Sequence, residues 1–241
     1  MSQYTIEQEI RLMKELEQYD TPTVTNAVAT YPGNPTCLEL YSPWDDNWYT
    51  DTSLKLMFPE LGRRCGYAVT CVYGLPDPGR DRSLRDVLWA LKEAPLPSVL
   101  LIKQDFPDRI KDKVGLCGGN MSTAFRSLGC IAIVSDGPSR DLEEVRNLGV
   151  QYMLTGVSAG HGPFTVKEVN TPVHICGMDA VPGDIIHMDV NGAVKFPRDM
   201  LGAVVENCRA IAADEEIMQA RMAASDDPDA IFRYIEGDYG D

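Results

Sequence analysis

Apolar residues in this chain alternate between short continuous runs and stripes at helical spacing, which is the pattern of an α/β protein. The runs and stripes predict, in order, a strand over 65–73, a helix over 83–93, a strand over 98–103, a helix over 121–128 and a strand over 130–134. A further helix is expected from residue 142, because Leu142, Val145 and Leu148 recur on one side.

The second half of the chain carries strands without long helices between them. We expect these strands over 151–155, 173–176, 184–189 and 193–196. Pro182-Gly183 and Asn191-Gly192 are turn signals between short strands. The sequence therefore predicts a closed or strongly curved sheet in this part of the chain.

Both ends of the chain have helical patterns. Residues 6–19 predict a surface helix or an interface arm, and residues 200–224 predict a longer helix. Residues 31–60, rich in Pro, Trp and Tyr, are expected to form a long irregular segment that covers a site or an interface. We expect one domain over residues 1–224 and an acidic tail over 225–241, either flexible or exchanged between subunits.

Composition excludes several classes of protein. The 241 residues, 44% of them hydrophobic, are enough for one good core. A net charge of −14 argues against direct binding to nucleic acid or to an acidic membrane. We find neither a signal-peptide pattern nor a membrane-length apolar stretch. Seven cysteines without a C-x-x-C motif predict reduced, mostly buried thiols in the cytoplasm, with Cys117 and Cys130 as packing residues.

Candidate chemistry lies where the 130–134 strand gives way to the next helix. An Asp-Gly-Pro turn is followed by Arg140 and Asp141. A guanidinium can hold a carboxylate in a planar fork, and a carboxylate can hold a hard divalent cation. A helix cap with a solvated neighbour is the alternative interpretation.

A glycine-containing helix start lies at Gly118, Gly119, Asn120 and Met121. Glycines there let backbone N–H groups approach an anion, which the helix dipole favours. A simple loop break is the alternative. Together with Arg140, this segment predicts a small-anion site at one end of the sheet.

The three histidines differ in their expected roles. His161 lies in a glycine-rich loop, and its ordinary pKa suits proton transfer near neutrality, so it is a catalytic candidate. His174 and His187 lie in predicted strands; His174 is expected to be structural, and His187 structural or interfacial.

Five segments in order resemble the RraA-like family, named for regulator of ribonuclease activity A, which also contains 4-hydroxy-4-methyl-2-oxoglutarate aldolases. They are residues 21–28, 62–70, 129–141, 170–173 and 182–194. The third is similar to the pattern G-x-x-G-x-V-x-D-G-x-x-R-D. The resemblance extends over roughly residues 15 to 200 and implies a swivelling β/β/α fold assembled as trimers or hexamers.

The resemblance also implies roles for particular residues. Arg140 would bind and polarise a pyruvate unit, and Asp141 would anchor Mg²⁺ or Mn²⁺. Backbone amides at Gly119–Met121 would hold the pyruvate carboxylate. Longer members use a C-terminal helix to reach a neighbouring subunit, so Glu216 is a candidate for that subunit's metal site; a solvated face is the alternative.

The chain departs from the aldolase pattern at two positions. That pattern, D-x20-R-D, has an acid where this chain has Gly119, and Asn120 beside it is neutral. Asn26 also stands where the family usually has Asp. A metal-bound water or His161 is then the expected proton donor.

The resulting expectation is a metal-dependent lyase that forms a pyruvate enolate from a small 2-oxo or hydroxy acid. The reaction would be retro-aldol cleavage or oxaloacetate-type decarboxylation. Two alternatives remain: a non-catalytic, acidic oligomeric regulator that docks on a protein partner, and a metal-dependent lyase acting on another hydroxy or oxo acid.

Overall fold

Four parallel strands form the centre of an eight-stranded mixed sheet. The computed structural model describes residues 4–31, 33–79 and 82–239. The parallel strands are β5 (Gln151–Leu154), β4 (Cys130–Ser135), β3 (Ser98–Asp105) and β2 (Arg64–Gly74), adjacent in that order. Their residues are almost all buried, which explains why they read as continuous apolar runs.

Antiparallel strands extend the sheet and curve it. They are β1 (Lys55–Leu56) on β5, β9 (Ile185–Asp189) on β2, β10 (Gly192–Phe196) on β9 and β6 (Thr165–Val169) on β2. The long strand β2 pairs with β9 through its first residues and with β6 through its last ones. A hairpin of β7 (Val173–Ile175) and β8 (Met178–Ala180) packs inside this curve. The nearly closed, barrel-like sheet confirms the predicted curvature.

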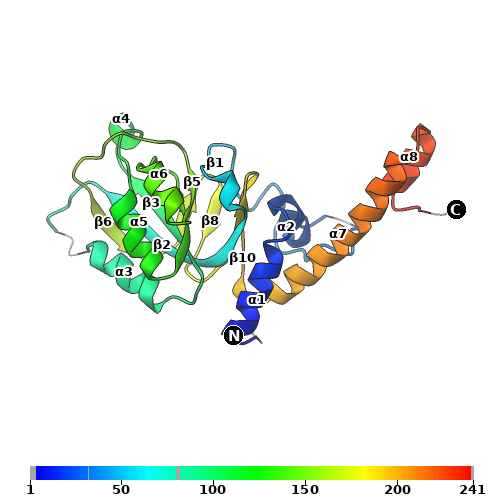
Figure 1. Ribbon diagram of the computed structural model, residues 1–241, viewed down its shortest axis with the longest axis horizontal. Helices are drawn as coiled ribbons and strands as arrows, with labels where there is room; N and C mark the ends of the chain where they lie inside the picture. Colours follow the sequence, from blue (N-terminus) through cyan, green and yellow to red (C-terminus); the bar gives the residue numbers. More distant parts are fainter. Residues whose placement is uncertain (1–3, 32, 80–81, 240–241) are drawn as a thin grey trace.

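Helices cover one face of the parallel strands (Figure 1). They are α3 (Leu84–Glu93), α5 (Gly119–Ser127) and α6 (Leu142–Asn147), with the short α4 (Asp108–Lys111) nearby. Along β3, Leu100 and Ile102 face these helices, whereas Val99 and Leu101 face the hairpin side. Because successive strand residues point to opposite faces, β3 contributes to two separate cores.

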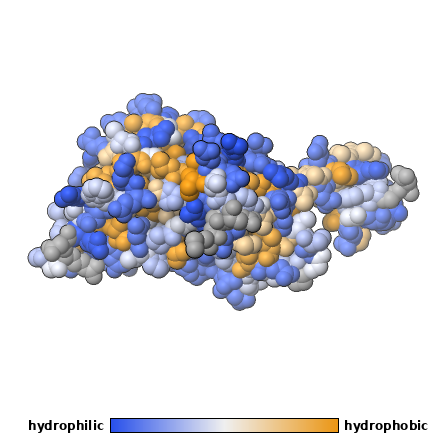
Figure 2. Space-filling view, turned by 90° about the horizontal axis from the view of Figure 1, so that it is seen from below, coloured by the Kyte–Doolittle hydropathy of each residue, from blue (hydrophilic) through white to orange (hydrophobic). Residues whose placement is uncertain are grey.

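A third core joins both ends of the chain. It lies among α1 (Ile6–Leu16), α2 (Thr21–Val28) and α7 (Leu201–Ala223), which follows the short 3-10 helix Arg198–Met200. The last buried residue of α7 is Ile211. Beyond it, α7 projects from the body and ends beside α8 (Pro228–Ile235), as Figures 1 and 2 show.

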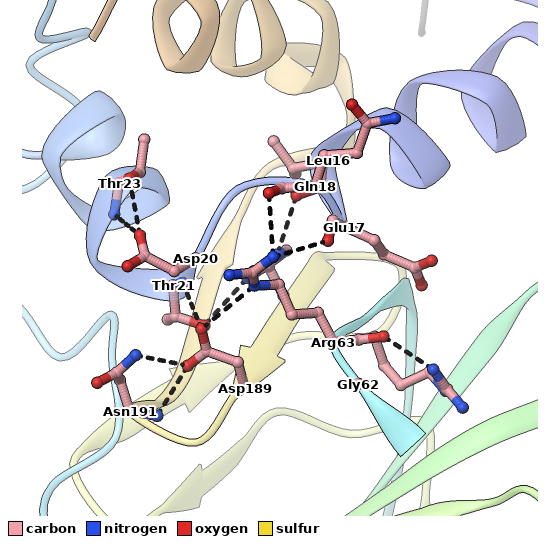
Figure 3. Close-up of polar contacts among 12 residues, drawn as sticks. Leu16, Glu17, Gln18, Asp20, Thr21, Thr23, Gly62, Arg63, Asp189 and Asn191 are labelled. Atoms are coloured by element: carbon pink, nitrogen blue, oxygen red, sulfur yellow. Dashed lines mark hydrogen bonds and ion pairs between the residues drawn. The ribbon is translucent and has the colours of Figure 1, made fainter. Parts of the chain in front are cut away.

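A polar network ties the α1–α2 turn to the sheet (Figure 3). The Arg63 guanidinium donates to the Gln18 carbonyl at 3.0 Å and lies 3.7 Å from an Asp189 carboxylate oxygen. Asp189 in turn accepts the Thr21 backbone N–H at 2.9 Å. The end of α1 and the start of α2 are thereby held to the end of β9.

The observed elements match most of the predicted ones and differ in a few places. α2, β6 and β8 were not predicted, and the helix expected over 121–128 begins two residues earlier, at Gly119. The expected acidic tail contains α8, so it is not wholly irregular. In the segment 31–60, the described residues (31 and 33–60) are mostly irregular, as expected, apart from β1 and the 3-10 helix Pro59–Leu61. In the described ranges, no helix has the length and apolar character needed to span a bilayer.

Candidate functional site

Two loops meet where α5 and α6 begin. The Arg140 N–H donates to the Cys117 carbonyl at 3.0 Å, and the Leu116 N–H donates to the Pro138 carbonyl at 2.9 Å. These bonds place the first residues of both helices beside each other, past the carboxyl end of β4. Open α/β sheets bind ligands at such strand ends.

A cavity of about 210 Å³ opens at this junction. Its lining consists of Gly115, Cys117, Gly118, Asn120, Met121, Arg140, Asp141, His161 and Phe164. Most of the residues proposed from sequence therefore border a single cavity. Gly119 is not among the lining residues, but its backbone N–H donates to Asp141 at 3.0 Å.

Arg140 and Asp141 combine opposite charges at this cavity. Arg140 Nε lies 3.4 Å from Asp141 Oδ2, and about a third of each side chain is exposed, 37% and 32%. Asp141 has a φ of 58° and a ψ of 43°, in the left-handed region that aspartate tolerates better than most residues. This backbone conformation turns the chain sharply from the loop into α6.

Gly118 allows the Asp141 carboxylate to lie directly against the backbone. A Cβ at position 118 would be 2.3 Å from Asp141 Oδ2 and 3.2 Å from Arg140 Nε. Any side chain there would displace the charged pair. The absence of a side chain at Gly118 therefore lets the Asp141 and Arg140 side chains keep their observed positions.

Glu144 is a neighbour of this site that sequence reasoning missed. A Cβ at Gly119 would lie 1.8 Å from Glu144 Oε2. The only sequence signal for Glu144 was its spacing, three residues after Asp141 in the first turn of a helix, which puts the two side chains on neighbouring positions.

The buried wall beneath the cavity is neutral and hydrogen-bonded. Cys117 Sγ lies 3.3 Å from Ser122 Oγ, which is 2.8 Å from the Tyr152 hydroxyl. Burial raises the pKa of the Cys117 thiol and of the Tyr152 phenol. Burial also raises the pKa of Cys130, to about 12. Both cysteines are buried in the hydrophobic core, in line with the expected packing positions, and a thiol with a raised pKa is a poor nucleophile.

His161 borders the cavity on an exposed loop. The Gly115 N–H donates to the Gly160 carbonyl at 2.9 Å, which fixes this loop next to α5. The His161 ring packs edge-on against Phe164, and Nδ1 lies 2.9 Å from the Gly162 carbonyl. Because a carbonyl can only accept, Nδ1 carries the proton in this contact and Nε2 is the other, available nitrogen.

The donor set suits a cation that keeps much of its water shell. Among the described residues, no three His, Cys, Asp or Glu side chains converge as a complete metal site. Asp141 borders the cavity, and within the described structure its Oδ1 accepts no hydrogen bond. Mg²⁺ is commonly held by one or two carboxylates, with water and substrate as the remaining ligands. Asp141 fits such a cation.

The remaining sequence candidates lie outside this cavity. Glu216 is on the outer part of α7, which runs away from α5 and α6 (Figure 1), so it does not reach the cavity of its own chain. Its role toward a neighbouring subunit stays a prediction. His187 is fully buried, whereas His174 is exposed and pairs with Asp179 on the β7–β8 hairpin. Asn26 lies in α2, far along the chain from this junction.

The sequence profile of the RraA-like family, described as Aldolase/RraA, matches residues 46–195. The chain belongs to the RraA-like family. The matched range contains every residue of the cavity lining, including Gly118, Arg140, Asp141 and His161.

Relatives in this family have varied names. An uncharacterized protein of Methanocaldococcus jannaschii, MJ0644, is 30% identical over 118 residues, which cover 48% of this chain and 57% of that protein. The 4-hydroxy-4-methyl-2-oxoglutarate aldolase of Thermus thermophilus is 25% identical over 157 residues, covering 62% and 87%. Protein DlpA of Legionella pneumophila is 34% identical over 104 residues, but the chain spans only 17% of its length. The chain spans just over half of the length of MJ0644.

Solved structures share the fold. An uncharacterized protein from Pseudomonas syringae superposes with a TM-score of 0.71 at 19% identity, covering 95% of this chain and 94% of that one. RraAS2 of Streptomyces coelicolor, described as an unusual member of the RNase ES inhibitor RraA protein family, gives 0.67 at 22% identity, covering 88% and 96%. The fold expected from the family resemblance is confirmed.

Proposed function

We propose that this RraA-like protein is a divalent-cation-dependent lyase acting on a small 2-oxo acid. It would form a pyruvate enolate by retro-aldol cleavage of a 4-hydroxy-2-oxo acid or by oxaloacetate-type decarboxylation. The observation that supports this most is the Arg140–Asp141 pair, which borders one cavity together with the start of α5. The aldolase names among its relatives are in line with this proposal.

Substrate binding would use two kinds of donor. Arg140 offers a planar fork of N–H groups that matches a carboxylate or a 2-oxo carboxylate edge. The N–H groups of Asn120 and Met121 belong to the first turn of α5, where backbone donors have no partner within the helix. An anionic substrate seated there would also lie at the positive end of the helix dipole.

Asp141 would hold Mg²⁺ or Mn²⁺ next to the bound acid. Such a cation supplies Lewis-acid stabilisation for negative charge that develops on the 2-oxo oxygen. Asp141 is itself fixed by the Gly119 N–H, so its carboxylate needs little rearrangement before it binds a cation. Arg140 stabilises the same developing charge from its own position on the cavity wall.

The reaction ends with proton delivery to the enolate carbon. His161 is the histidine on the cavity wall, and its Nε2 can carry the proton in the imidazolium form. The loop that carries His161 is bound to the residues before α5 by the Gly115–Gly160 hydrogen bond. This bond keeps the imidazole near the place where the substrate would lie.

The test is a coupled pyruvate-release assay with oxaloacetate and 4-hydroxy-4-methyl-2-oxoglutarate, in Mn²⁺ or Mg²⁺ and then in EDTA. Asp141→Asn is the informative variant, because asparagine tolerates the left-handed backbone and can still accept the Gly119 hydrogen bond. We expect cation-dependent pyruvate release that falls by about 100-fold or more in this variant. Turnover that survives both EDTA and Asp141→Asn would contradict the proposal. A wild-type chain that neither turns over substrate nor binds Mn²⁺ would favour the non-catalytic regulator instead.

A further inference from the structure

The space beyond the Gly119 α-carbon is occupied by the carboxylate of Glu144. A Cβ at position 119 would lie 1.8 Å from Glu144 Oε2, 2.9 Å from its Cδ and 3.2 Å from its Cβ. The preceding glycine has the same relationship to the other acid, since a Cβ at 118 would lie 2.3 Å from Asp141 Oδ2. Two acidic side chains therefore lie against two consecutive glycines at the start of α5.

Both acids come from the start of α6. Asp141 is its N-cap residue and Glu144 follows three residues later. Side chains at this spacing are neighbours on a helix surface. The placement of α6 beside α5 then presents both carboxylates to the positive end of the α5 dipole.

We propose that Glu144 supplies the second carboxylate of the cation site whose first ligand is Asp141. This inference rests on the proposed function, and it explains how the site can work with glycine at position 119. An acid on α5 at that position would direct its side chain into the space that the Glu144 carboxylate fills. Glu144 thus provides from α6 the charge that the aldolase pattern places on α5.

The physical effect of Glu144 is on cation affinity. Glu144 does not itself line the cavity, but its carboxylate and that of Asp141 both lie against Gly119. A second negative charge beside the cation adds Coulomb attraction and an oxygen that can bind the cation or one of its waters. Residues that hold the outer shell of a metal site affect its affinity by about 10- to 100-fold. In this scheme Glu144 acts on the cation or its waters, Asp141 is the first ligand of the cation, and Arg140 contacts the substrate.

A purely structural role for Glu144 makes a different prediction. An acid in the first turn of a helix stabilises that helix by interacting with its dipole. Glu143 lies in the same turn of α6 and is also exposed, so it is a matched control for this effect. Both acids should therefore stabilise α6 to a similar extent, whereas only Glu144 should affect the affinity for the cation.

The experiment is Mn²⁺ titration by isothermal calorimetry of the full chain and of Glu144→Ala, Glu143→Ala and the double variant Gly119→Asp/Glu144→Ala. We expect Glu144→Ala to weaken Mn²⁺ binding by about tenfold or more and Glu143→Ala to change it less than about twofold. The double variant should recover most of the affinity, because removal of the Glu144 carboxylate makes room for an acid on α5.

Thermal unfolding without cation keeps the result interpretable, because it shows whether each variant folds. Wild-type affinity in Glu144→Ala, or equal losses in the Glu143 and Glu144 variants, would overturn the role of Glu144. Failure of the proposed function looks different. In that case the wild type and Asp141→Asn would bind Mn²⁺ with the same affinity, or neither would bind it. Affinity restored by the double variant would support both the site and the exchange of the acid between helices.

Discussion

His187 shows how burial sets the charge of a single residue. Its ring lies between the Thr21 hydroxyl and the Leu16 carbonyl, with no exposed surface. Burial lowers its pKa from 6.5 to about 4, against a smaller opposing effect of Asp189. His187 is therefore neutral in the folded protein at neutral pH and stays so well below the pKa of an unfolded histidine.

This shift predicts a loss of stability in acid. Between pH 6.5 and about 4 the unfolded chain binds a proton at His187 that the folded chain does not, so the free energy of unfolding decreases as the pH falls. The contribution of one proton is at most about 1.4 kcal/mol per pH unit. Urea unfolding at a series of pH values measures it. His187→Gln should flatten the dependence; equal slopes in the wild type and in this variant would refute the assignment.

The candidate site shows what sequence can and cannot predict about individual residues. That Arg140, Asp141 and Gly118 border one cavity was predictable, because they lie in short motifs at two neighbouring helix starts. Glu144 was not, because its carboxylate reaches Gly119 only through the packing of α6 against α5. Contacts between elements depend on the whole fold, and a single sequence does not specify them directly.

At the level of elements, the helix α1 is anchored by a buried charge. Glu9 is fully buried and accepts three hydrogen bonds from the Arg198 guanidinium, at 2.7, 2.9 and 3.2 Å, and one from the Tyr67 hydroxyl. It thereby joins α1 to β2 and to the segment before α7. Removing one partner of such a buried network leaves the other groups without compensation.

Glu9→Gln should therefore destabilise the protein measurably. We expect the free energy of unfolding to fall by about 1–3 kcal/mol, the range for a lost hydrogen bond to a charged group. Glu15 is the matched control, since it lies on the same helix and also pairs with an arginine, Arg209, near the surface. Glu15→Gln should cost less than about 1 kcal/mol. Equal losses in the two variants, measured by urea unfolding, would argue against α1 being held by its buried acid.

The elements that sequence analysis missed have physical explanations. α2 reads TPTVTNAV, in which threonine and valine disfavour a helix. It forms nevertheless, because Asp20 caps it and Val24, Ala27 and Val28 are buried in the core. β8 is only three residues long, which is too short for an alternating pattern of apolar and polar residues to be recognised. The long central strands were predictable because burial on both faces produces an uninterrupted apolar run.

On the scale of the whole molecule, the C-terminal arm stands apart from the body. This arm consists of the part of α7 that follows Ile211 and of α8. In α8 the one buried residue is Ala230, while Phe232 and Ile235 are 62% and 56% exposed. The arm therefore contributes little to the core of its own chain, as its separation in Figures 1 and 2 indicates. The trimer or hexamer expected from the family resemblance would give these apolar residues a partner.

Deletion of residues 226–241 tests the independence of the body. Because so little apolar surface of α8 is buried, we expect the thermal midpoint to change by no more than about 3 °C, corresponding to about 1 kcal/mol. Differential scanning calorimetry at two protein concentrations, with light scattering for the molar mass, measures both stability and assembly. A larger decrease that depends on concentration would show instead that the arm stabilises contacts between copies.

The left-handed backbone at Asp141 has a consequence for how such proteins can diverge. Asparagine and glycine adopt that conformation at least as readily as aspartate. A lineage can therefore exchange this one residue, lose the carboxylate that we propose as a cation ligand and keep the turn on which α6 depends. If Asp141 does hold the cation, one substitution that leaves folding unaffected would remove the proposed chemistry and keep the architecture. The description Aldolase/RraA for one family is compatible with such a separation of fold and function.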